Sequence, residues 1–271
     1  MAYSGAAAYY DQSCRYKTPV FYCGPCDIFY RRVDQRRLVS HYYAASYVQG
    51  KNEESLFRGR VEFFRWILSL GREYGAVRAA GEPGLPVLLD FGSAYGHLLR
   101  LAGEQGFHAV GVELNEDLVR ACRKRGLTVY GGIDEVPGKV DVVTALDSLY
   151  CVADPRSLLA ALRDKLQPGG VFLARVTNRN LFARLRAKFV HPGDFSVIGD
   201  ATVSYSLKGI RKLLDSSGFR IQAVIPDHGQ GKKLGARRRL FYGFTYLLTL
   251  AALKRRVLTP GIIVIATVAD P

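Results

Sequence analysis

Hydrophobic and polar positions alternate along this chain with two different periods, which predict helices and strands in turn. The segment 54–72 carries apolar residues at helical spacing, namely Leu56, Val61, Phe64, Ile67 and Leu68. This spacing places them on one face, so we expect an amphipathic helix there. The short apolar run Val87–Leu89 follows a loop rich in glycine and proline and is typical of a buried strand.

The same alternation continues to the end of the chain. Strands are predicted around Leu127–Tyr130, Val140–Ala145, Phe219–Ile225 and Gly261–Val268, and also after Pro168-Gly169-Gly170. Asn115, Asp154 and Ser206 stand where helix N-caps are expected, and Gly218 stands where the last of these helices should end. Strands that alternate with helices predict an α/β, doubly wound parallel sheet with helices on both faces.

One glycine-rich turn carries the clearest chemical signal. Asp90 ends the first strand of this core, and the turn Gly92-Ser93-Ala94-Tyr95-Gly96 follows it. After the next helix, a second strand ends at another acid, Glu113. A strand, tight turn, helix and strand of this kind hold a nucleoside-bearing cofactor at the carboxyl edge of the sheet, with a carboxylate on the ribose hydroxyls.

The glycine spacing favours one cofactor over another. A dinucleotide fingerprint reads G-x-G-x-x-G, whereas Ala94 occupies the position of the middle glycine here. An acid beside the turn, Asp90, suits a cationic ligand better than a pyrophosphate. The chain resembles the class I S-adenosylmethionine-dependent methyltransferases in Leu89–Gly96 and Val110–Glu113, and again in Val140–Ala145 and Leu166–Leu173.

That resemblance implies a mostly parallel, seven-stranded, Rossmann-like sheet whose last strand inserts antiparallel between strands five and six. It implies S-adenosyl-L-methionine as cofactor, with Asp90 at its methionine end, Glu113 on its ribose, and adenine between Leu114 and the loop Ile133-Asp134. The cofactor-binding residues expected from it are Asp90, Gly92, Ser93, Ala94, Gly96, Glu113, Leu114, Ile133, Asp134 and Ala145.

The residues that would act on a methyl acceptor are harder to assign. Related methyltransferases often carry Glu-His after strand four, where this chain has Tyr150-Cys151. Asp147 is the best substitute for a general base, and His41 and Tyr43 are candidates for a lid over the site. We expect methyl transfer to oxygen or carbon of a small-molecule or lipid-linked acceptor. A non-catalytic cofactor-binding protein and an NAD-dependent oxidoreductase remain as alternatives.

The N-terminal segment 1–53 is rich in tyrosine and cysteine and is expected to be irregular. Cys23-Gly24-Pro25-Cys26 has the spacing of a zinc knuckle, and the segment resembles the knuckle-bearing start of some methyltransferases. Cys14 lacks a paired cysteine, so only Cys14, Cys23 and Cys26 are available, and His41 would have to complete a zinc site. A relic knuckle packed as a loop is the favoured interpretation.

The charge of the chain gives information about its binding partners. The 271 residues carry a formal net charge of +14, which favours anionic partners. The segment 232–256 places basic clusters on both sides of a mostly apolar run that is too short to span a bilayer. Such a helix would either lie on an anionic membrane surface or pack its apolar side against the sheet. No nucleic-acid motif accompanies the charge, so small-molecule partners are favoured over nucleic acid.

The pattern divides the chain into four parts: an N-terminal segment 1–53, a helix and linker 54–86, a cofactor-binding core 87–176, and an acceptor-side region 177–271 that holds an insertion, the last strands and the basic helix. No stretch reads as a secretory signal or a membrane span. We therefore expect a cytoplasmic protein, with peripheral contact to the inner membrane surface as an option.

Overall fold

A seven-stranded sheet forms the centre of the protein in a computed structural model, in the order β10-β11-β8-β7-β4-β5-β6. The structure describes residues 5–10, 15–31, 57–75, 84–190, 201–227, 235–252 and 257–269. The strands of this sheet are β4 (Val87–Phe91), β5 (His108–Val112), β6 (Thr128–Tyr130), β7 (Val140–Leu146), β8 (Leu166–Thr177), β10 (Phe219–Asp227) and β11 (Gly261–Val268). Only β11 runs antiparallel to its neighbours β8 and β10, which confirms the predicted insertion of the last strand.

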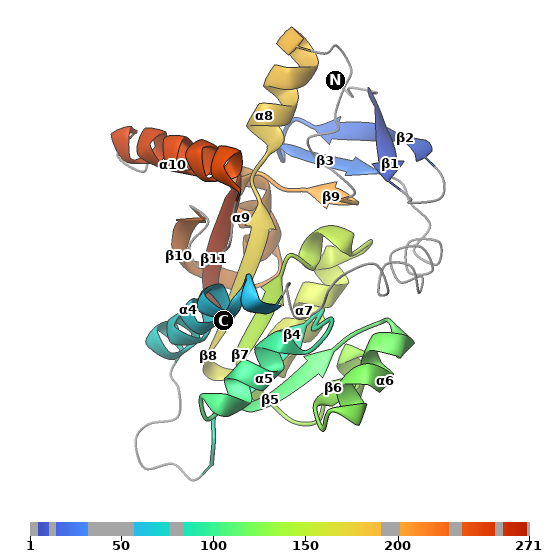
Figure 1. Cartoon of the computed structure of the whole chain (residues 1–271), viewed down its shortest axis with the longest axis vertical. Helices are drawn as coiled ribbons and strands as arrows, with labels where there is room; N and C mark the ends of the chain where they lie inside the picture. The colour runs from blue at the N-terminus through green and yellow to red at the C-terminus, as the bar shows by residue number, and fades with distance from the viewer. Residues whose placement is uncertain are drawn as a thin grey trace.

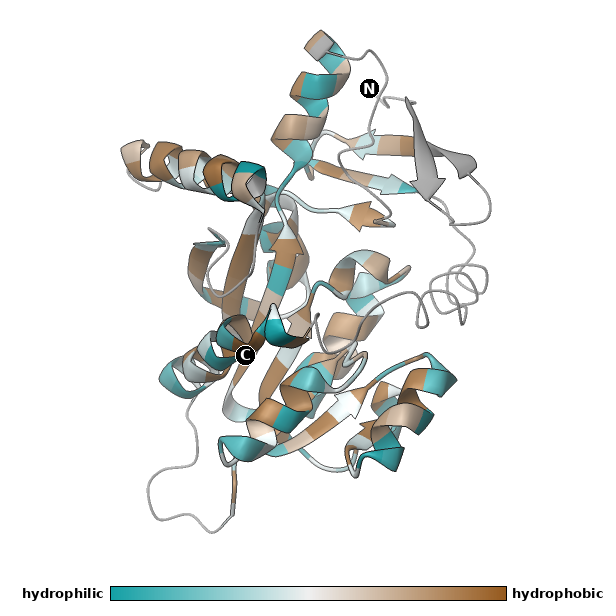
Figure 2. Ribbon diagram, in the orientation of Figure 1, coloured by the Kyte–Doolittle hydropathy of each residue, from teal (hydrophilic) through white to brown (hydrophobic). Residues whose placement is uncertain are grey.

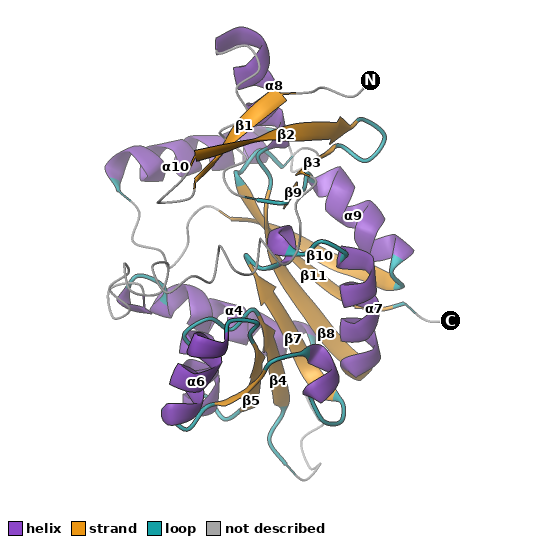
Figure 3. Cartoon of the chain, turned by 90° about the vertical axis from the view of Figure 1, so that its right-hand side faces the viewer, coloured by secondary structure: helices purple, strands orange, loops and turns teal. Residues whose placement is uncertain are grey.

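Helices cover both faces of the sheet (Figures 1 and 3). One face packs against α4 (Val61–Tyr74), α5 (His97–Glu104) and α6 (Glu116–Lys124), and the other against α7 (Pro155–Lys165) and α9 (Leu207–Ser216). The expected caps are present: Asn115, Asp154 and Ser206 each accept backbone N–H bonds at a helix start. Helix α4 begins at Val61, whereas the sequence pattern predicted a helix from residue 54.

Two hydrophobic clusters explain why the strands read as continuous apolar runs. Alternate residues of one strand belong to different clusters: Leu88 packs with α4 and α5, whereas Leu89 packs with α7 and α9. Both side chains are fully buried. A strand buried on both faces needs apolar residues at every position, which is the pattern of a parallel sheet between two helical layers.

The N-terminal segment is not irregular where the structure describes it, and this prediction was wrong. A small antiparallel sheet consists of β1 (Gly5–Tyr10), β2 (Arg15–Cys23), β3 (Ile28–Arg31) and β9 (Val203–Ser204). The last of these strands comes from much later in the sequence than the other three. Its tyrosines and phenylalanines are residues with high strand propensity. The sheet lies beyond the carboxyl edge of the main sheet (Figure 1).

The insertion after β8 links the two sheets. It begins with α8 (Asn180–Leu185) and the π-helical turn η3 (Arg186–Val190). Asn180 is buried, and its amide donates to the carbonyls of Asp27 (2.6 Å) and Ser204 (3.0 Å). Ala183 packs with Val20 and Phe29 of the small sheet. The remaining helix, α10 (Ala236–Ala251), lies beside β10 and α8 at the same end of the molecule (Figure 1).

Candidate functional site: the turn after the first core strand

The turn after β4 is held tightly against the end of β5. The backbone N–H groups of Gly92 and Ser93 both donate to the carbonyl of Val112, at 2.8 and 3.1 Å. Gly92 has a φ of +79°, and a Cβ added there would lie 2.7 Å from the Cβ of Ser148. Only glycine meets both conditions at that position, because it alone adopts this φ without strain and leaves room for Ser148.

Glu113 organises the turn from the neighbouring strand. One of its carboxylate oxygens accepts from the N–H of Ala94, and the other from the N–H of Asn115, both at 2.9 Å. Ala94 has a φ of +48°, an uncommon conformation for a residue with a Cβ. Burial raises the pKa of Glu113, and these backbone N–H donors counteract the rise. The carboxylate therefore holds the turn in place through the N–H of Ala94.

Asp90 lies at the floor of the same site. It is buried and accepts a hydrogen bond from the Thr144 hydroxyl on β7. Burial raises the pKa of Asp90 from 3.8 to about 7; the Thr144 hydroxyl lowers it, and the charge of Glu113 raises it further. Two carboxyl groups thus converge on one turn, and neither forms an ion pair with a basic side chain among the residues that the structure describes. This arrangement suits a cationic ligand.

A cavity of about 150 Å³ opens at this turn. Asp90, Gly92, Ser93 and Ala94 line it, which brings together four of the residues predicted from the sequence. The hydroxyls of Ser93 and Ser148 are buried, and neither has a hydrogen-bond partner among the described residues. Buried hydroxyls normally form hydrogen bonds. These two hydroxyls beside a glycine turn, each without a partner among the described residues, therefore fit a site that receives polar groups of a cofactor.

The other predicted cofactor residues lie at or near the same sheet edge. Leu114 follows β5 and is 43% exposed, and Ile133 and Asp134 belong to the short helix η1 (Ile133–Glu135) after β6. Gly96 is the N-cap of α5, with a φ of +71°. Ala145, in contrast, is fully buried in the core, and its neighbour Leu146 lines the cavity instead.

Asp147 is held by a buried ion pair at the carboxyl end of β7. The guanidinium of Arg175 bonds to its carboxylate and also to Asp227, at 2.7 Å in the second case. Burial opposes the charge on Arg175, but Asp147 and Asp227 together keep its pKa above the usual value. Asp147 itself has a φ of +62°. The carboxylate of Asp147 is therefore already engaged by a cation.

Three other predicted residues, Cys14, His41 and Tyr43, lie outside the described residues. Cys23 and Cys26 are free thiols at the turn between β2 and β3, and a hydrogen bond to Cys23, with some burial, raises the pKa of Cys26. Within the described part of the chain, no group of three or more metal-ligating side chains comes together.

Several residues that complete the cavity were not predicted from the sequence, among them Arg60 just before α4, Phe64 of α4 and His97 of α5. The His97 ring stacks on Tyr95 at a centroid distance of 5.6 Å and lies 5.0 Å from Phe57. Tyr95 and His97 flank the second glycine of the turn, so their position was a usable signal. Arg60 and Phe64 reach the cavity through the packing of α4 on α5, which no local pattern reveals.

Comparison with known proteins agrees with this geometry. A family model described as a methyltransferase domain matches residues 57–224, which is more than half of the chain. The ubiquinone biosynthesis O-methyltransferase of Methylococcus capsulatus is 38% identical over 110 residues, covering 36% of this chain and 46% of the relative. The enzyme of the same name from Pseudomonas aeruginosa is 31% identical over 126 residues, covering 41% and 54%. The chain thus spans about half the length of these curated relatives.

Solved structures show the same fold at low sequence identity. The putative methyltransferase of Haloferax volcanii, in complex with the Trm112 activator, has a TM-score of 0.56 at 15% identity, covering 84% of this chain and 98% of that one. The magnesium protoporphyrin IX methyltransferase of Synechocystis, solved with bound SAM, has a TM-score of 0.53 at 15% identity, covering 88% and 99%. Together with the glycine turn and its two acids, these matches establish that the chain belongs to the class I S-adenosylmethionine-dependent methyltransferases.

Proposed function

We propose that this protein transfers a methyl group from S-adenosylmethionine to an oxygen atom, or alternatively a carbon atom, of a small-molecule or lipid-linked acceptor. The observation that carries the proposal is the turn 92–96 between two buried acids, Asp90 and Glu113, with the orphan hydroxyls of Ser93 and Ser148 beside it. The curated relatives are named for O-methylation, which favours oxygen as the accepting atom.

Each residue of the site has a role in this proposal. Asp90 would face the ammonium of the methionine end, directly or through water, because a buried carboxylate gains from a cation. Glu113 would accept hydrogen bonds from the ribose hydroxyls while it keeps the N–H of Ala94 in place. Leu114 and the η1 residues Ile133 and Asp134 would enclose the adenine. Leu146 takes the place that the sequence suggested for Ala145.

When bound, S-adenosylmethionine supplies a methyl group made electrophilic by the sulfonium. The protein's share of the catalysis is then mostly alignment of the acceptor with that group. Asp147 stands on the acceptor side, after β7, but its ion pair with Arg175 makes it a positioning residue in our proposal. His41 and Tyr43 are retained as candidates for the residues that cover the acceptor.

Calorimetric titration with S-adenosylmethionine, S-adenosylhomocysteine and NAD is the first test. We expect the first two to bind and NAD to show no binding at millimolar concentration. NAD binding without S-adenosylmethionine binding would overturn the proposal. Incubation with a metabolite extract and methyl-labelled cofactor then tests transfer. A labelled product supports the enzyme, whereas tight cofactor binding with no labelled product under any extract would favour the non-catalytic alternative.

We also propose that α10 lies on an anionic membrane surface, as a peripheral contact on the cytoplasmic side. The observation behind this is the orientation of the helix. Its buried residues are Thr245 and Thr249, whereas most of its large apolar side chains face outward: Leu240, Phe241, Phe244, Leu247, Leu248 and Leu250 are all at least 38% exposed. This exposure favours the membrane contact over the alternative in which these side chains pack against the sheet.

The threonines explain how α10 tolerates this inverted arrangement. The Thr245 hydroxyl donates to the carbonyls of Phe241 and Tyr242, at 3.0 Å each, and the Thr249 hydroxyl donates to Thr245. Thr249 also accepts from the N–H of Leu258. The two threonines are thus hydrogen-bonded inside the protein. The apolar residues in which α10 is rich (Figure 2) are left exposed, where they can contact a membrane. Among the described residues, no helix is long and apolar enough to cross a membrane.

A further inference from the structure

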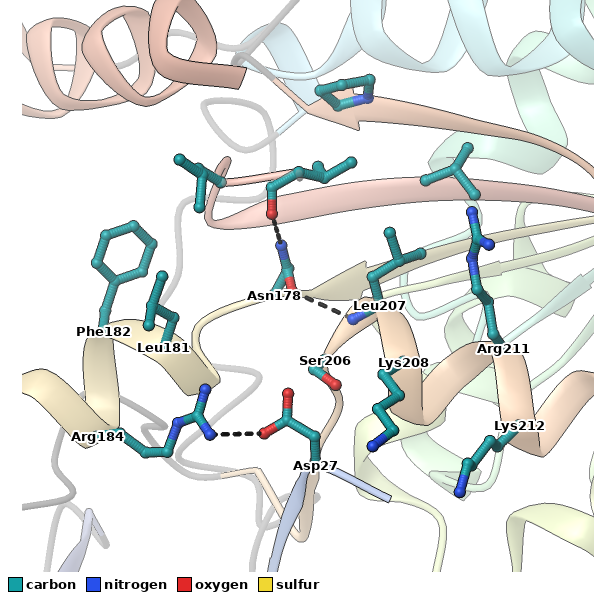
Figure 4. Close-up of a pocket in the computed structure, with 14 residues that line it drawn as sticks. Asp27, Asn178, Leu181, Phe182, Arg184, Ser206, Leu207, Lys208, Arg211 and Lys212 are labelled. Atoms are coloured by element: carbon teal, nitrogen blue, oxygen red, sulfur yellow. Dashed lines mark hydrogen bonds and ion pairs between the residues drawn. The ribbon is translucent and has the colours of Figure 1, made fainter. Parts of the chain in front are cut away.

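A large cavity lies away from the cofactor turn, between α8, α9 and the ends of β10 and β11 (Figure 4). Its volume is about 720 Å³. It is bordered on one side by the charged residues Arg184, Lys208, Arg211, Lys212 and Asp27, and on the other by the apolar residues Leu181, Phe182, Val224, Pro226, Val257 and Leu258.

This cavity is separate from the proposed cofactor site. In the sheet order, β11, β8 and β7 stand between β10, which borders the cavity, and β4, which carries Asp90. Neighbouring strands are about 4.8 Å apart, so the two strands are on the order of 19 Å apart. The part of the cavity beside β10 is therefore well away from Asp90.

Positive charge on the cavity wall exceeds negative charge. Arg184 lies 3.5 Å from Asp27, the one acid of the lining, and also donates to the Tyr22 hydroxyl. Lys208 and Arg211 make no ion pair within the described part of the chain, and both are exposed residues of the cavity lining. In Figure 4 they point to opposite sides of α9, Lys208 on the side of Asp27 and Arg211 away from it.

The position of Lys208 on α9 is itself unfavourable. Lys208 lies in the first turn of the helix, where no acid is present to balance the positive end of the helix dipole. The helix α6 shows the usual arrangement, with Glu116 and Asp117 in its first turn. An anion bound beside Lys208 would offset the positive charge of that side chain and of the helix end.

The opposite wall of the cavity is apolar and would favour an apolar part of a ligand. Leu181 is 38% exposed, and the ring of Phe182 meets that of Phe241 on α10 at a centroid distance of 5.3 Å. The apolar wall therefore continues over Phe182 onto the outward side of α10. A ligand with its anionic end on α9 would have its apolar part directed toward α8 and α10.

We propose that this cavity binds a phosphate group joined to an apolar group. Phosphate carries more than one charge and several acceptor oxygens, so it matches a site with more than one cation better than a carboxylate does. The ligand's source is either a phospholipid headgroup or a soluble phosphate ester with an apolar part. The proposal does not depend on cofactor binding, because no residue lines both this cavity and the cofactor turn.

The test is equilibrium binding of dihexanoyl phosphatidic acid, used below its micelle concentration, to the full chain. Inorganic phosphate and dihexanoylglycerol serve as the head-only and tail-only probes. We expect each of these to bind at least about tenfold more weakly than the phosphatidic acid, because each loses one half of the contact. Equal binding of dihexanoylglycerol would overturn the proposal.

Two double variants test whether binding depends on this cavity or only on the positive net charge of the protein. Lys208→Gln with Arg211→Gln should weaken the phosphatidic acid by at least about tenfold. The control, Lys124→Gln with Arg156→Gln, removes the same charge from exposed positions elsewhere and should leave binding within about twofold. Unchanged thermal unfolding shows that both variants fold. If the α9 variant and the control bind alike, the proposal is wrong.

The two sources are distinguished with vesicles. If the ligand is a membrane lipid, the α9 variant should also lose sedimentation with phosphatidylglycerol vesicles relative to the control. If the ligand is soluble, sedimentation is unchanged and only the monomeric ester is lost. Titration of S-adenosylmethionine in parallel should show no change in the α9 variant. A loss of cofactor binding there would mean that the cavity is part of the cofactor site, which contradicts the proposal.

Discussion

The Thr144 hydroxyl donates a 2.7 Å hydrogen bond to the Asp90 carboxyl inside the core of the protein. Thr144 is fully buried on β7, and Asp90 is on the adjacent strand β4. The bond stabilises the charged form of Asp90, but burial outweighs it, so the pKa is about 7. The acid at the cofactor turn is therefore expected to titrate in the physiological range.

Cofactor binding should consequently strengthen as the pH rises through about 7. A cationic methionine end favours the ionised carboxylate, so binding below this pH must first release a proton. Titration at about pH 6 and about pH 8, in buffers with different ionisation enthalpies, would show both the change in affinity and the proton release. Asp90→Asn should bind more weakly and lose this pH dependence. A pH dependence that survives in Asp90→Asn would mean that another group is responsible.

The same pKa shift predicts how stability without cofactor depends on pH. The folded chain keeps its proton on Asp90 between about 3.8 and about 7, whereas the unfolded chain has lost it. The stability linked to this proton is full below about pH 3.8 and is lost as the pH rises through about 7. Asp90→Asn should therefore raise the melting temperature relative to wild type more at about pH 8 than at about pH 5.

Glu113 is predicted to have both a structural and a binding role. Glu113→Ala removes the acceptor for Ala94 N–H and Asn115 N–H and should weaken cofactor binding by about 1–3 kcal/mol. Glu113→Gln keeps one acceptor oxygen and should lie between wild type and Glu113→Ala. If Glu113→Ala melts at a lower temperature but binds the cofactor with unchanged affinity, the acid serves only the turn.

Gly92 offers a test of close packing at the turn. Gly92→Ala introduces a Cβ 2.7 Å from Ser148 Cβ at a φ of +79°, whereas Gly126→Ala, at +77°, meets nothing within 4 Å. Both variants bear a left-handed strain of about 1–2 kcal/mol. Gly92→Ala should lose a further amount of about 1–3 kcal/mol in denaturant unfolding, since the core cannot accept the methyl group. Equal losses would show that Ser148 moves aside.

The main sheet could be predicted because the residues that mark the ends of its helices and strands are close together in sequence. The caps at Asn115 and Asp154, the stop at Gly218 and the β-branched run Gly261–Val268 each depend on neighbours in sequence. The glycine turn and its two acids were predictable for the same reason. The antiparallel insertion of β11 followed from the family resemblance and is confirmed.

Long-range packing explains what the sequence did not reveal. The partner of β3 is β9, which lies far along the chain, so the small sheet could not be predicted from spacing. Asp147 was chosen as a base from its place after β7, but its partner Arg175 is on β8 and its second acid, Asp227, is on β10. The outward apolar side of α10 depends on which face meets the protein, and composition alone does not decide that.

The ion pairs of Arg175 lead to a prediction about catalysis. Arg175→Met would leave two acids without their cation and should cost about 3–5 kcal/mol of stability. Asp147→Asn keeps the pair with Asp227 and should cost less. If Asp147 positions the acceptor, its variant should lower turnover without changing the acidic limb of the pH–rate profile. Loss of that limb in Asp147→Asn would identify Asp147 as the general base.

The outward side of α10 predicts binding to anionic membranes. In a flotation assay, the protein should rise with vesicles that contain phosphatidylglycerol more than with phosphatidylcholine alone. Basic residues such as Arg237 and Arg239 flank the apolar run, and each could add about 1 kcal/mol near an anionic surface. A few hundred millimolar salt should screen most of this attraction.

Substitutions in α10 test whether flotation depends on this helix or only on the positive net charge of the whole protein. Phe244→Ser with Leu247→Ser removes two side chains that are 59% and 64% exposed, so flotation should fall while the fold is retained. Leu85→Ser is the matched control, because Leu85 is 57% exposed but lies in the loop before β4. Equal flotation with neutral and anionic vesicles, or none with either, would rule out an electrostatic membrane contact. A wild-type dimer that dissociates in the α10 variant would instead assign the outward side of α10 to a second copy of the chain.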